Sequence, residues 1–256
     1  MSGEPVWIDS HNHHYLTSLS VLSDLSQRGL SGLVEASWIP VRPSSWSTLE
    51  DLFRWLTEVE RQRLSRIGVR LMVALGVHPR CIPPGFSSNV KRLEGWLEMN
   101  GVVALGEVGI DSGSEEEREA FREQLRVARA LDRPAIVHTP RMRKAEIARL
   151  ELQIIREVGF PEELAVIDHF NAELLNELPK GRYMVGLSLQ PGKLSVGEAV
   201  ELVYRLEPER ILINSDSSTE PSEPSWGLEL LRRLSERDGE LARMAGWKNA
   251  QRFFGL

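Results

Sequence analysis

Short apolar, β-branched runs alternate along the chain with longer segments in which apolar residues recur at helical spacing. The runs are continuous rather than alternating in polarity, which is typical of parallel strands buried on both faces. Eight such runs occur, at residues 6–11, 32–37, 70–77, 102–110, 134–139, 164–170, 183–189 and 210–216.

The segments between these runs read as helices. The clearest is 114–132, where Ser114 is followed three residues later by Glu117, a capping box with acidic residues in the first turn. Residues 48–64 and 195–206 show the same helical periodicity. The segment after the sixth run, 171–180, is so brief that we expect a short or irregular helix there.

A strand followed by a helix, repeated eight times, predicts an α/β fold of the (β/α)8 TIM-barrel type. We expect one such domain over residues 1–256. An open, doubly wound sheet is the competing architecture. No G-x-G-x-x-G follows the first run and no P-loop is present, so a nucleotide-binding version of that sheet has no support.

Composition and charge limit the binding partners and the cellular compartment that we expect for this protein. The net charge of −6 implies no broad basic field, so tight sequence-independent binding to nucleic acid is not favoured. One cysteine, Cys81, excludes an intrachain disulfide. No apolar run approaches a membrane span and the first ten residues do not resemble a signal peptide, so we expect a cytoplasmic protein without membrane contact.

The histidines all fall where predicted strands end, which in a barrel of this type is the catalytic face. Glu107 and Asp216 also lie in such apolar runs, where an unpaired carboxylate would be costly. The six histidines are His11, His13, His14, His78, His138 and His169.

His11 and His13 are two residues apart on a strand, so their side chains point to the same side and can bind one cation. Imidazole and carboxylate together suit Zn²⁺, with Mn²⁺ or Mg²⁺ as alternatives. Four histidines and two acids are enough for two divalent ions bridged by Glu107. The expected metal ligands are His11, His13, Glu107, His138, His169 and Asp216.

Two histidines have simpler interpretations. His14 points away from the side shared by its neighbours and is expected to be a core or loop residue. His78 is either a supporting residue behind the ligands or a substrate contact. Arginine and lysine side chains near the strand ends are candidates for phosphate contacts or plain surface charges: Arg80, Arg141, Arg143 and Lys193.

Several motifs together resemble the TatD-related metal-dependent hydrolases of the amidohydrolase superfamily, and the resemblance spans the whole chain. IDSHNH resembles the D-x-H-x-H opening of that family, GVHP its G-x-H-P, and ALGEVGID its G-E-x-G-[LI]-D signature. INSD occupies the place of the strand 8 aspartate, and WKNAQRFFGL resembles the N-A-x-R-[LF]-F terminus.

The resemblance implies a role for each matched residue. His11, His13 and Asp216 would bind one metal, His138 and His169 a second, and Glu107 would bridge the two. Asp216 would also activate the attacking water, so it and Glu107 are the expected catalytic residues. His78, Arg141 and Asn171 are the expected substrate contacts.

Typical members hydrolyse phosphodiester bonds in DNA or related compounds, but this chain departs from them near the substrate. Members usually have an arginine directly after the strand 5 histidine, whereas in this chain Thr139 and Pro140 separate His138 from Arg141. The leading hypothesis is a metal-dependent phosphoesterase or phosphodiesterase acting on a small-molecule or nucleic-acid phosphoester. The alternatives are an amidohydrolase cleaving an amide, lactone or cyclic amide, and a metal-binding protein without turnover.

Overall fold

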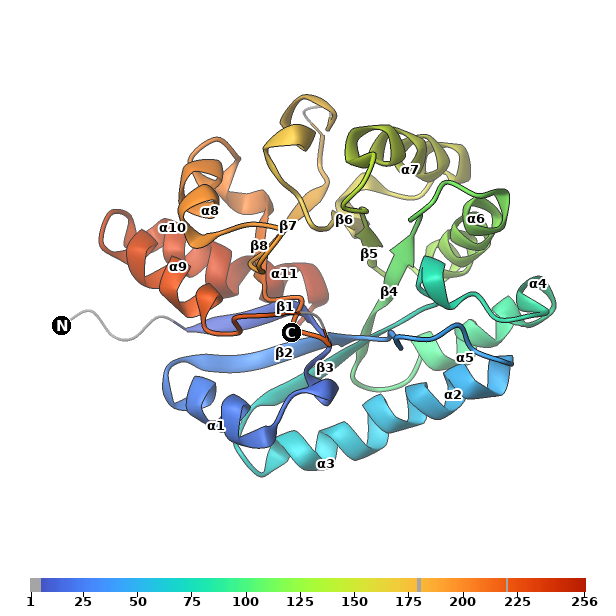
Figure 1. Ribbon diagram of the computed structural model, residues 1–256, viewed down its shortest axis with the longest axis horizontal. Coiled ribbons are helices and arrows are strands. Elements are labelled where there is room, and N and C mark those ends of the chain that lie inside the picture. Colours follow the sequence, from blue (N-terminus) through green and yellow to red (C-terminus); the bar gives the residue numbers. More distant parts are fainter. Residues whose placement is uncertain (1–5, 179–180, 220) are drawn as a thin grey trace.

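The computed structural model describes residues 6–178, 181–219 and 221–256. Eight parallel strands, paired in sequence order, form one sheet that curls into a barrel with helices around it (Figure 1). The predicted TIM-barrel fold is therefore confirmed. The strands are β1 Trp7–Asn12, β2 Leu30–Ala36, β3 Arg70–Leu75, β4 Val102–Gly109, β5 Ala135–His138, β6 Ala165–Ile167, β7 Met184–Ser188 and β8 Ile211–Asn214.

The first and last strands meet and bring the barrel close to closure. The backbone N–H of Asp216 donates to His11 O at 3.1 Å, and the N–H of His13 donates to Ser217 O at 2.8 Å. The indole N–H of Trp7 also donates to the carbonyl of Ile213. These bonds tie β1 and the residue after it to β8 and the residues that follow it, although the two segments lie at opposite ends of the sequence.

Helices follow the strands as the periodicity predicts. They are α1 Leu19–Gln27, α2 Trp46–Arg54, α3 Glu60–Ser65, α4 Phe86–Asn89, α5 Leu93–Leu97, α6 Glu115–Ala130, α7 Lys144–Val158, α8 Val196–Val203, α9 Trp226–Ser235, α10 Gly239–Arg243 and α11 Asn249–Phe254. The capping box of Ser114 and Glu117 is present at the start of α6. A π-helical turn, Trp55–Val59, joins α2 to α3 within the predicted helix 48–64.

The connection after β6 departs from the α-helical pattern. Only a 3-10 helix, Ala172–Asn176, occupies it within the described residues. This confirms the expectation of a short or irregular element; residues 179–180 of the predicted segment lie outside the described residues.

The barrel interior is filled by apolar side chains at one end. Val34 and Ala36 of β2, like Met72 and Ala74 of β3, alternate along their strands and face inward. Ala250 and Phe254 of α11 pack in the same cluster, so the C-terminal helix covers this end of the barrel. The polar side chains of the site lie at the opposite, carboxyl ends of the strands.

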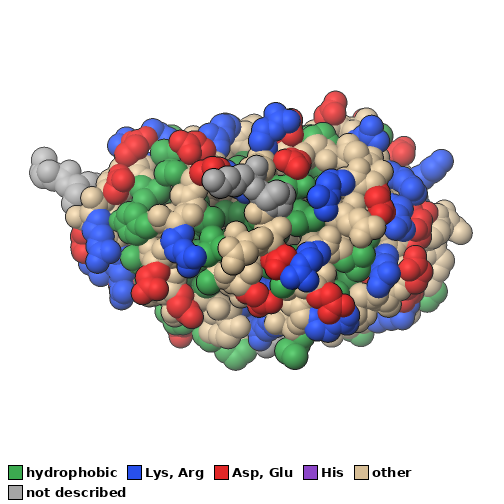
Figure 2. All heavy atoms as spheres, turned by 90° about the horizontal axis from the view of Figure 1, so that it is seen from above, with side chains coloured by type: hydrophobic (Ala, Val, Ile, Leu, Met, Phe, Trp, Pro, Cys, Tyr) green, Lys and Arg blue, Asp and Glu red, His purple; other side chains and the backbone are tan. Residues whose placement is uncertain are grey.

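The surface carries charges of both signs. Figure 2 shows one face on which acidic and basic side chains are interspersed rather than gathered into a basic field. Within the described residues, no helix is long and apolar enough to cross a membrane.

Candidate metal centre

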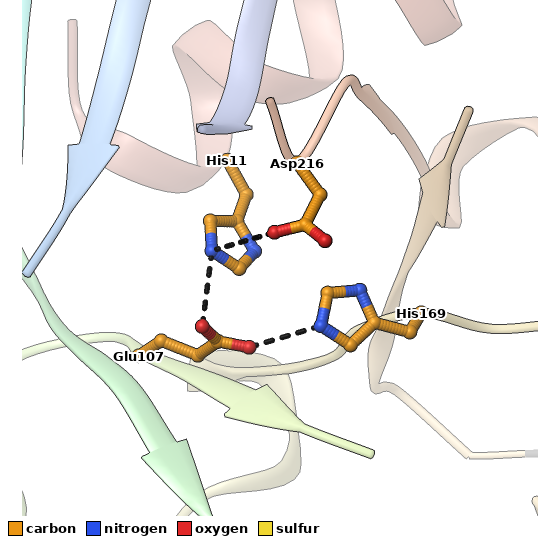
Figure 3. A group of neighbouring side chains, drawn as sticks. All are labelled: His11, Glu107, His169 and Asp216. Atoms are coloured by element: carbon orange, nitrogen blue, oxygen red, sulfur yellow. Dashed lines mark hydrogen bonds and ion pairs between the residues drawn. The ribbon is translucent and has the colours of Figure 1, made fainter. Parts of the chain in front are cut away.

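Glu107 lies near the end of β4 and is the centre of a group of histidines (Figure 3). Its Oε1 is 2.7 Å from His138 Nδ1 and 2.9 Å from His169 Nε2. Its Oε2 lies 3.4 Å from His11 Nε2, 3.6 Å from His13 Nε2 and 3.7 Å from His78 Nε2. Histidine or glutamate side chains at the ends of five strands therefore meet at one point.

Asp216, two residues beyond β8, faces the same point from the other side (Figure 3). Its Oδ1 lies 3.4 Å from His13 Nε2 and 3.9 Å from His11 Nε2. The structure thus brings together all six residues predicted as metal ligands, although their roles as ligands stay a prediction.

Two subsets have ligand atoms within 4.8 Å of one another, close enough to share an ion. One is His11, Glu107, His169 and Asp216; the other is His78, Glu107 and His138. Glu107 belongs to both, as the predicted bridging position requires. In these subsets His169 lies with His11 and Asp216, whereas the sequence-based pairing placed it with His138, and His78 takes a position beside His138.

The donor set fits a transition metal ion. All six predicted ligands are buried, and Asp216, the most exposed, shows 7% of its surface. His11 Nε2 is buried and has no hydrogen-bond partner among the described residues, although it faces two carboxylates. Such an atom is costly unless something else satisfies it, and imidazole nitrogens with carboxylate oxygens are the donors that Zn²⁺ and Mn²⁺ accept.

Hydrogen bonds behind the histidines set the direction of their rings. His13 Nδ1–H donates to the carbonyl of Ala36 at 2.8 Å, which leaves Nε2 to face Glu107 and Asp216. His169 Nδ1 lies 2.7 Å from the hydroxyl of Ser188, and its Nε2 faces Glu107. Such outer contacts orient metal-binding imidazoles in proteins.

The charged groups of the site shift the pKa values of the two carboxylates Glu107 and Asp216. Burial alone would raise the pKa of Glu107, but His11, His138 and His78 together bring that pKa well below its ordinary value. Burial likewise opposes ionisation of Asp216, and the Lys193 ammonium is the main cause that brings its pKa well below normal. Both acids are therefore ionised at neutral pH.

Two site residues adopt backbone conformations that L-residues rarely use. The φ angle is +52° at His169 and +45° at Asp216. Conformations of this kind persist where surrounding structure imposes them and cluster at functional sites. The loops after β6 and β8 thus place both side chains over the barrel mouth at some conformational cost.

The other predicted site residues take different positions. His78 is buried beside Glu107 and also lines the pocket over the site, so its role as a substrate contact stays a prediction. His14 is held away from the group by Asp9 and Thr17. Asn171 caps the 3-10 helix after β6 and lines a side pocket next to the site. Its role in substrate binding stays a prediction.

A pocket opens over the metal-ligand candidates; its volume is about 630 Å³ when the open solvent at its mouth is included. Arg141, Arg80 and Lys193 line it. Arg80 donates to both carboxylate oxygens of Asp111 at 2.9 Å, and Arg143 pairs with Glu146 outside the pocket. Its other lining residues are His13, Trp38, His78, Glu107, His138, Thr139, His169, Gln190, Asp216 and Ser218.

Sequence reasoning missed three contacts of the site. Asp168 is fully buried and contacts His11 Nδ1; its signal was an acid within the apolar run of residues 164–170, the same signal that marked Glu107. Asp111 contacts His138 Nε2 at 3.2 Å. Lys193 was a candidate for a phosphate contact or a surface charge. Its ammonium instead pairs with the carboxylate of Asp216 and lies within 3.2 Å of both ring nitrogens of His169.

Comparisons with known proteins identify the family of the chain. The family model described as TatD related DNase matches residues 8–255. An uncharacterized metal-dependent hydrolase of Methanocaldococcus jannaschii is 32% identical over 82% of this chain and 83% of its own length. The crystal structure of a TatD-like protein from Archaeoglobus fulgidus is 33% identical, with a TM-score of 0.85 over 98% of this chain and 100% of that one.

More distant structures share the fold alone. An uncharacterized amidohydrolase from Saccharomyces cerevisiae is 16% identical, with a TM-score of 0.68 over 98% of this chain and 100% of that one. The family match covers nearly the whole chain and two relatives exceed 30% identity. The chain therefore belongs to the TatD related DNase family and is, in general class, a metal-dependent hydrolase.

Proposed function

We propose that this protein is a phosphodiesterase that uses two divalent ions, Zn²⁺ or Mn²⁺ before Mg²⁺, to cleave a phosphodiester in a small molecule or at a nucleic-acid end. The observation that carries the proposal is the juxtaposition of cations and candidate metal ligands. Arg80, Arg141 and Lys193 line the same pocket as Glu107 and Asp216. Guanidinium and ammonium groups are the side chains that bind phosphoryl oxygens best.

The ions would be held as the family resemblance implies. His11, His13 and Asp216 would hold one, His138 and His169 the other, and Glu107 would lie between them. Two divalent ions held by these residues would lower the pKa of a water molecule and would stabilise the negative charge that develops on phosphoryl and leaving oxygens.

Asp216 is the proposed proton carrier. Its carboxylate is ionised at neutral pH and can accept a proton from the attacking water, then return it to the leaving oxygen. Lys193 contacts Oδ2, so it fixes the carboxylate with Oδ1 toward His13. Lys193 therefore orients the base as well as adding positive charge to the pocket.

Arg141 is the proposed contact for the phosphoryl group. Its guanidinium donates to Gln190 Oε1 at 3.1 Å, and Gln190 donates to the backbone carbonyl of Asp216 at 2.9 Å. This chain of bonds holds Arg141 at the pocket wall. Arg141 makes no ion pair with any residue that the structure describes, so its charge is not already neutralised by a carboxylate.

Comparing the rates at which the protein hydrolyses two kinds of bond tests the substrate class. With Mn²⁺, the protein is expected to cleave a bis-aryl phosphodiester faster than an aryl lactone. Arg141→Gln should lower kcat/KM for the phosphodiester about tenfold, since a charged hydrogen bond contributes about 1.5 kcal/mol, and should leave lactone turnover unchanged.

The matched control is Arg143→Gln. Arg143 is two residues away and exposed, but it pairs with Glu146 and does not line the pocket. Lactone or amide turnover that clearly exceeds phosphodiester turnover in the unmodified protein would replace this proposal with the amidohydrolase alternative.

A further inference from the structure

Asp168 directly follows β6 and lies behind the metal-ligand candidates. Its carboxylate contacts side chains of β1 and β8 and lies close to the backbone of β7. Its Oδ2 contacts Nδ1 of His11 on β1, and its Oδ1 accepts from Nδ2 of Asn214 on β8 at 2.8 Å. The carboxylate is fully buried, and Asn214 exposes 1% of its surface. Each carboxylate oxygen thus has its own donor, one from each of the strands that nearly close the barrel.

Strand β7 leaves space for this carboxylate. Gly186 lies on β7, and a Cβ added there would collide with Oδ1 of Asp168 and come within 3.1 Å of Asn214 Nδ2. The φ angle of Gly186 is not in the left-handed region, so conformation does not require glycine at this position. The missing side chain is explained by the space that Asp168 occupies.

The contact determines which nitrogen of His11 faces the site. With Oδ2 accepting from Nδ1–H, a ring that gives up its second proton to bind a metal ion carries its lone pair on Nε2. Nε2 is the buried atom without a hydrogen-bond partner, and it faces Glu107 Oε2 at 3.4 Å. The opposite tautomer would direct an N–H at the metal centre.

We propose that Asp168 is a positioning residue that keeps His11 in the Nδ1–H form and so presents Nε2 to a metal ion. The proposal rests on the metal centre proposed above. It assigns Asp168 no contact with the substrate or the ion, because His11 lies between them and the carboxylate.

Asp168→Asn tests this with nearly unchanged shape. Asn214 Nδ2 still requires an acceptor, so the new amide oxygen turns toward it and the NH₂ group toward His11 Nδ1. His11 then accepts at Nδ1 and carries its proton on Nε2. Zn²⁺ affinity, measured by competition with a chromophoric chelator, should fall about 10–100-fold, as for other residues that orient a metal-binding histidine.

A reciprocal exchange should restore binding. In the Asp168→Asn/Asn214→Asp double variant, the amide NH₂ of residue 168 donates to the new carboxylate, and its oxygen again accepts from His11 Nδ1–H. Zn²⁺ affinity should return toward that of the unmodified protein. A purely structural role for Asp168 predicts further loss instead, because both buried positions are altered.

The matched control is Asp9→Asn. Asp9 is equally buried on β1; its carboxylate contacts His14, which is outside both candidate metal subsets, and accepts from the backbone N–H and the hydroxyl of Ser215. An asparagine keeps an oxygen that accepts from the Ser215 N–H, so this variant should lower the unfolding temperature yet leave Zn²⁺ affinity unchanged. A second readout is the Nδ1 proton of His11 in ¹H–¹⁵N spectra of the zinc-loaded protein, expected in the unmodified protein and the Asp9→Asn variant.

The outcomes separate the two proposals. If the unmodified protein binds no Zn²⁺, the metal centre itself is wrong. If it binds Zn²⁺ and Asp168→Asn binds equally well, or the spectrum shows the His11 proton on Nε2, only the positioning role is overturned. The spectrum of the unmodified protein decides the matter even if Asp168→Asn does not fold.

Discussion

Asp216→Asn is expected to keep its bound metal and to lose phosphodiester turnover by roughly 10²–10⁴-fold, the usual contribution of a positioned general base. Asparagine preserves the shape of the side chain and an oxygen that can approach a metal ion, but its amide cannot accept the proton of the attacking water. It also tolerates the left-handed backbone at this position, where φ is +45°, better than most residues.

Metal content and unfolding temperature are the controls for this variant. Both should stay close to those of the unmodified protein while kcat falls. Near-normal turnover with metal bound would show that another group takes the proton. Loss of folding would instead show that Asp216 acts in the structure, where it pairs with Lys193 and bonds to His11 O through its backbone.

Glu107→Gln is expected to lose most of the bound metal and to lower metal-dependent turnover by about 10²–10³-fold, the usual loss when a preorganised electrostatic contact to the transition state is removed. Among the residues that the structure describes, Glu107 is the one carboxylate that lies within 3.7 Å of histidine nitrogens from four other strands or strand ends. Replacing it by a neutral amide removes the negative charge common to both candidate ion positions. Elemental analysis of the purified variant measures the loss directly.

Glu35→Gln is the matched control for that change. Glu35 is also a fully buried glutamate on a barrel strand, and neither of its carboxylate oxygens has a hydrogen-bond partner among the described residues. Burial raises the pKa of Glu35 well above its ordinary value, so neutralising it changes little charge. If Glu35→Gln loses metal as Glu107→Gln does, the loss reflects general damage to the barrel.

The fold and much of the site follow from local patterns in the sequence. Strands buried on both faces need continuous apolar runs, so a histidine or acid at the end of such a run stands out. His11, His138 and Glu107 were identified in this way, and the structure brings them together. The π-helical turn between α2 and α3 was not predicted, because it continues the same apolar periodicity.

The contacts that were missed depend on strands far apart in the sequence. Asp168 meets His11 across 157 residues, and no local pattern assigns it that partner rather than the adjacent His169. Lys193 lies in a loop where a lysine is normally solvated, and only the packing of that loop after β7 places its ammonium on Asp216. Register between strands determines the first contact and loop packing the second, and neither can be seen in the local composition.

The most direct test of the account is phosphodiester turnover by the unmodified protein before and after removal of metal. Chelation should abolish cleavage of a bis-aryl phosphodiester, and adding Mn²⁺ or Zn²⁺ should restore it, with up to two ions bound per chain by elemental analysis. Failure to bind either ion after incubation, or turnover that is unchanged by chelation, would contradict the metal-dependent mechanism.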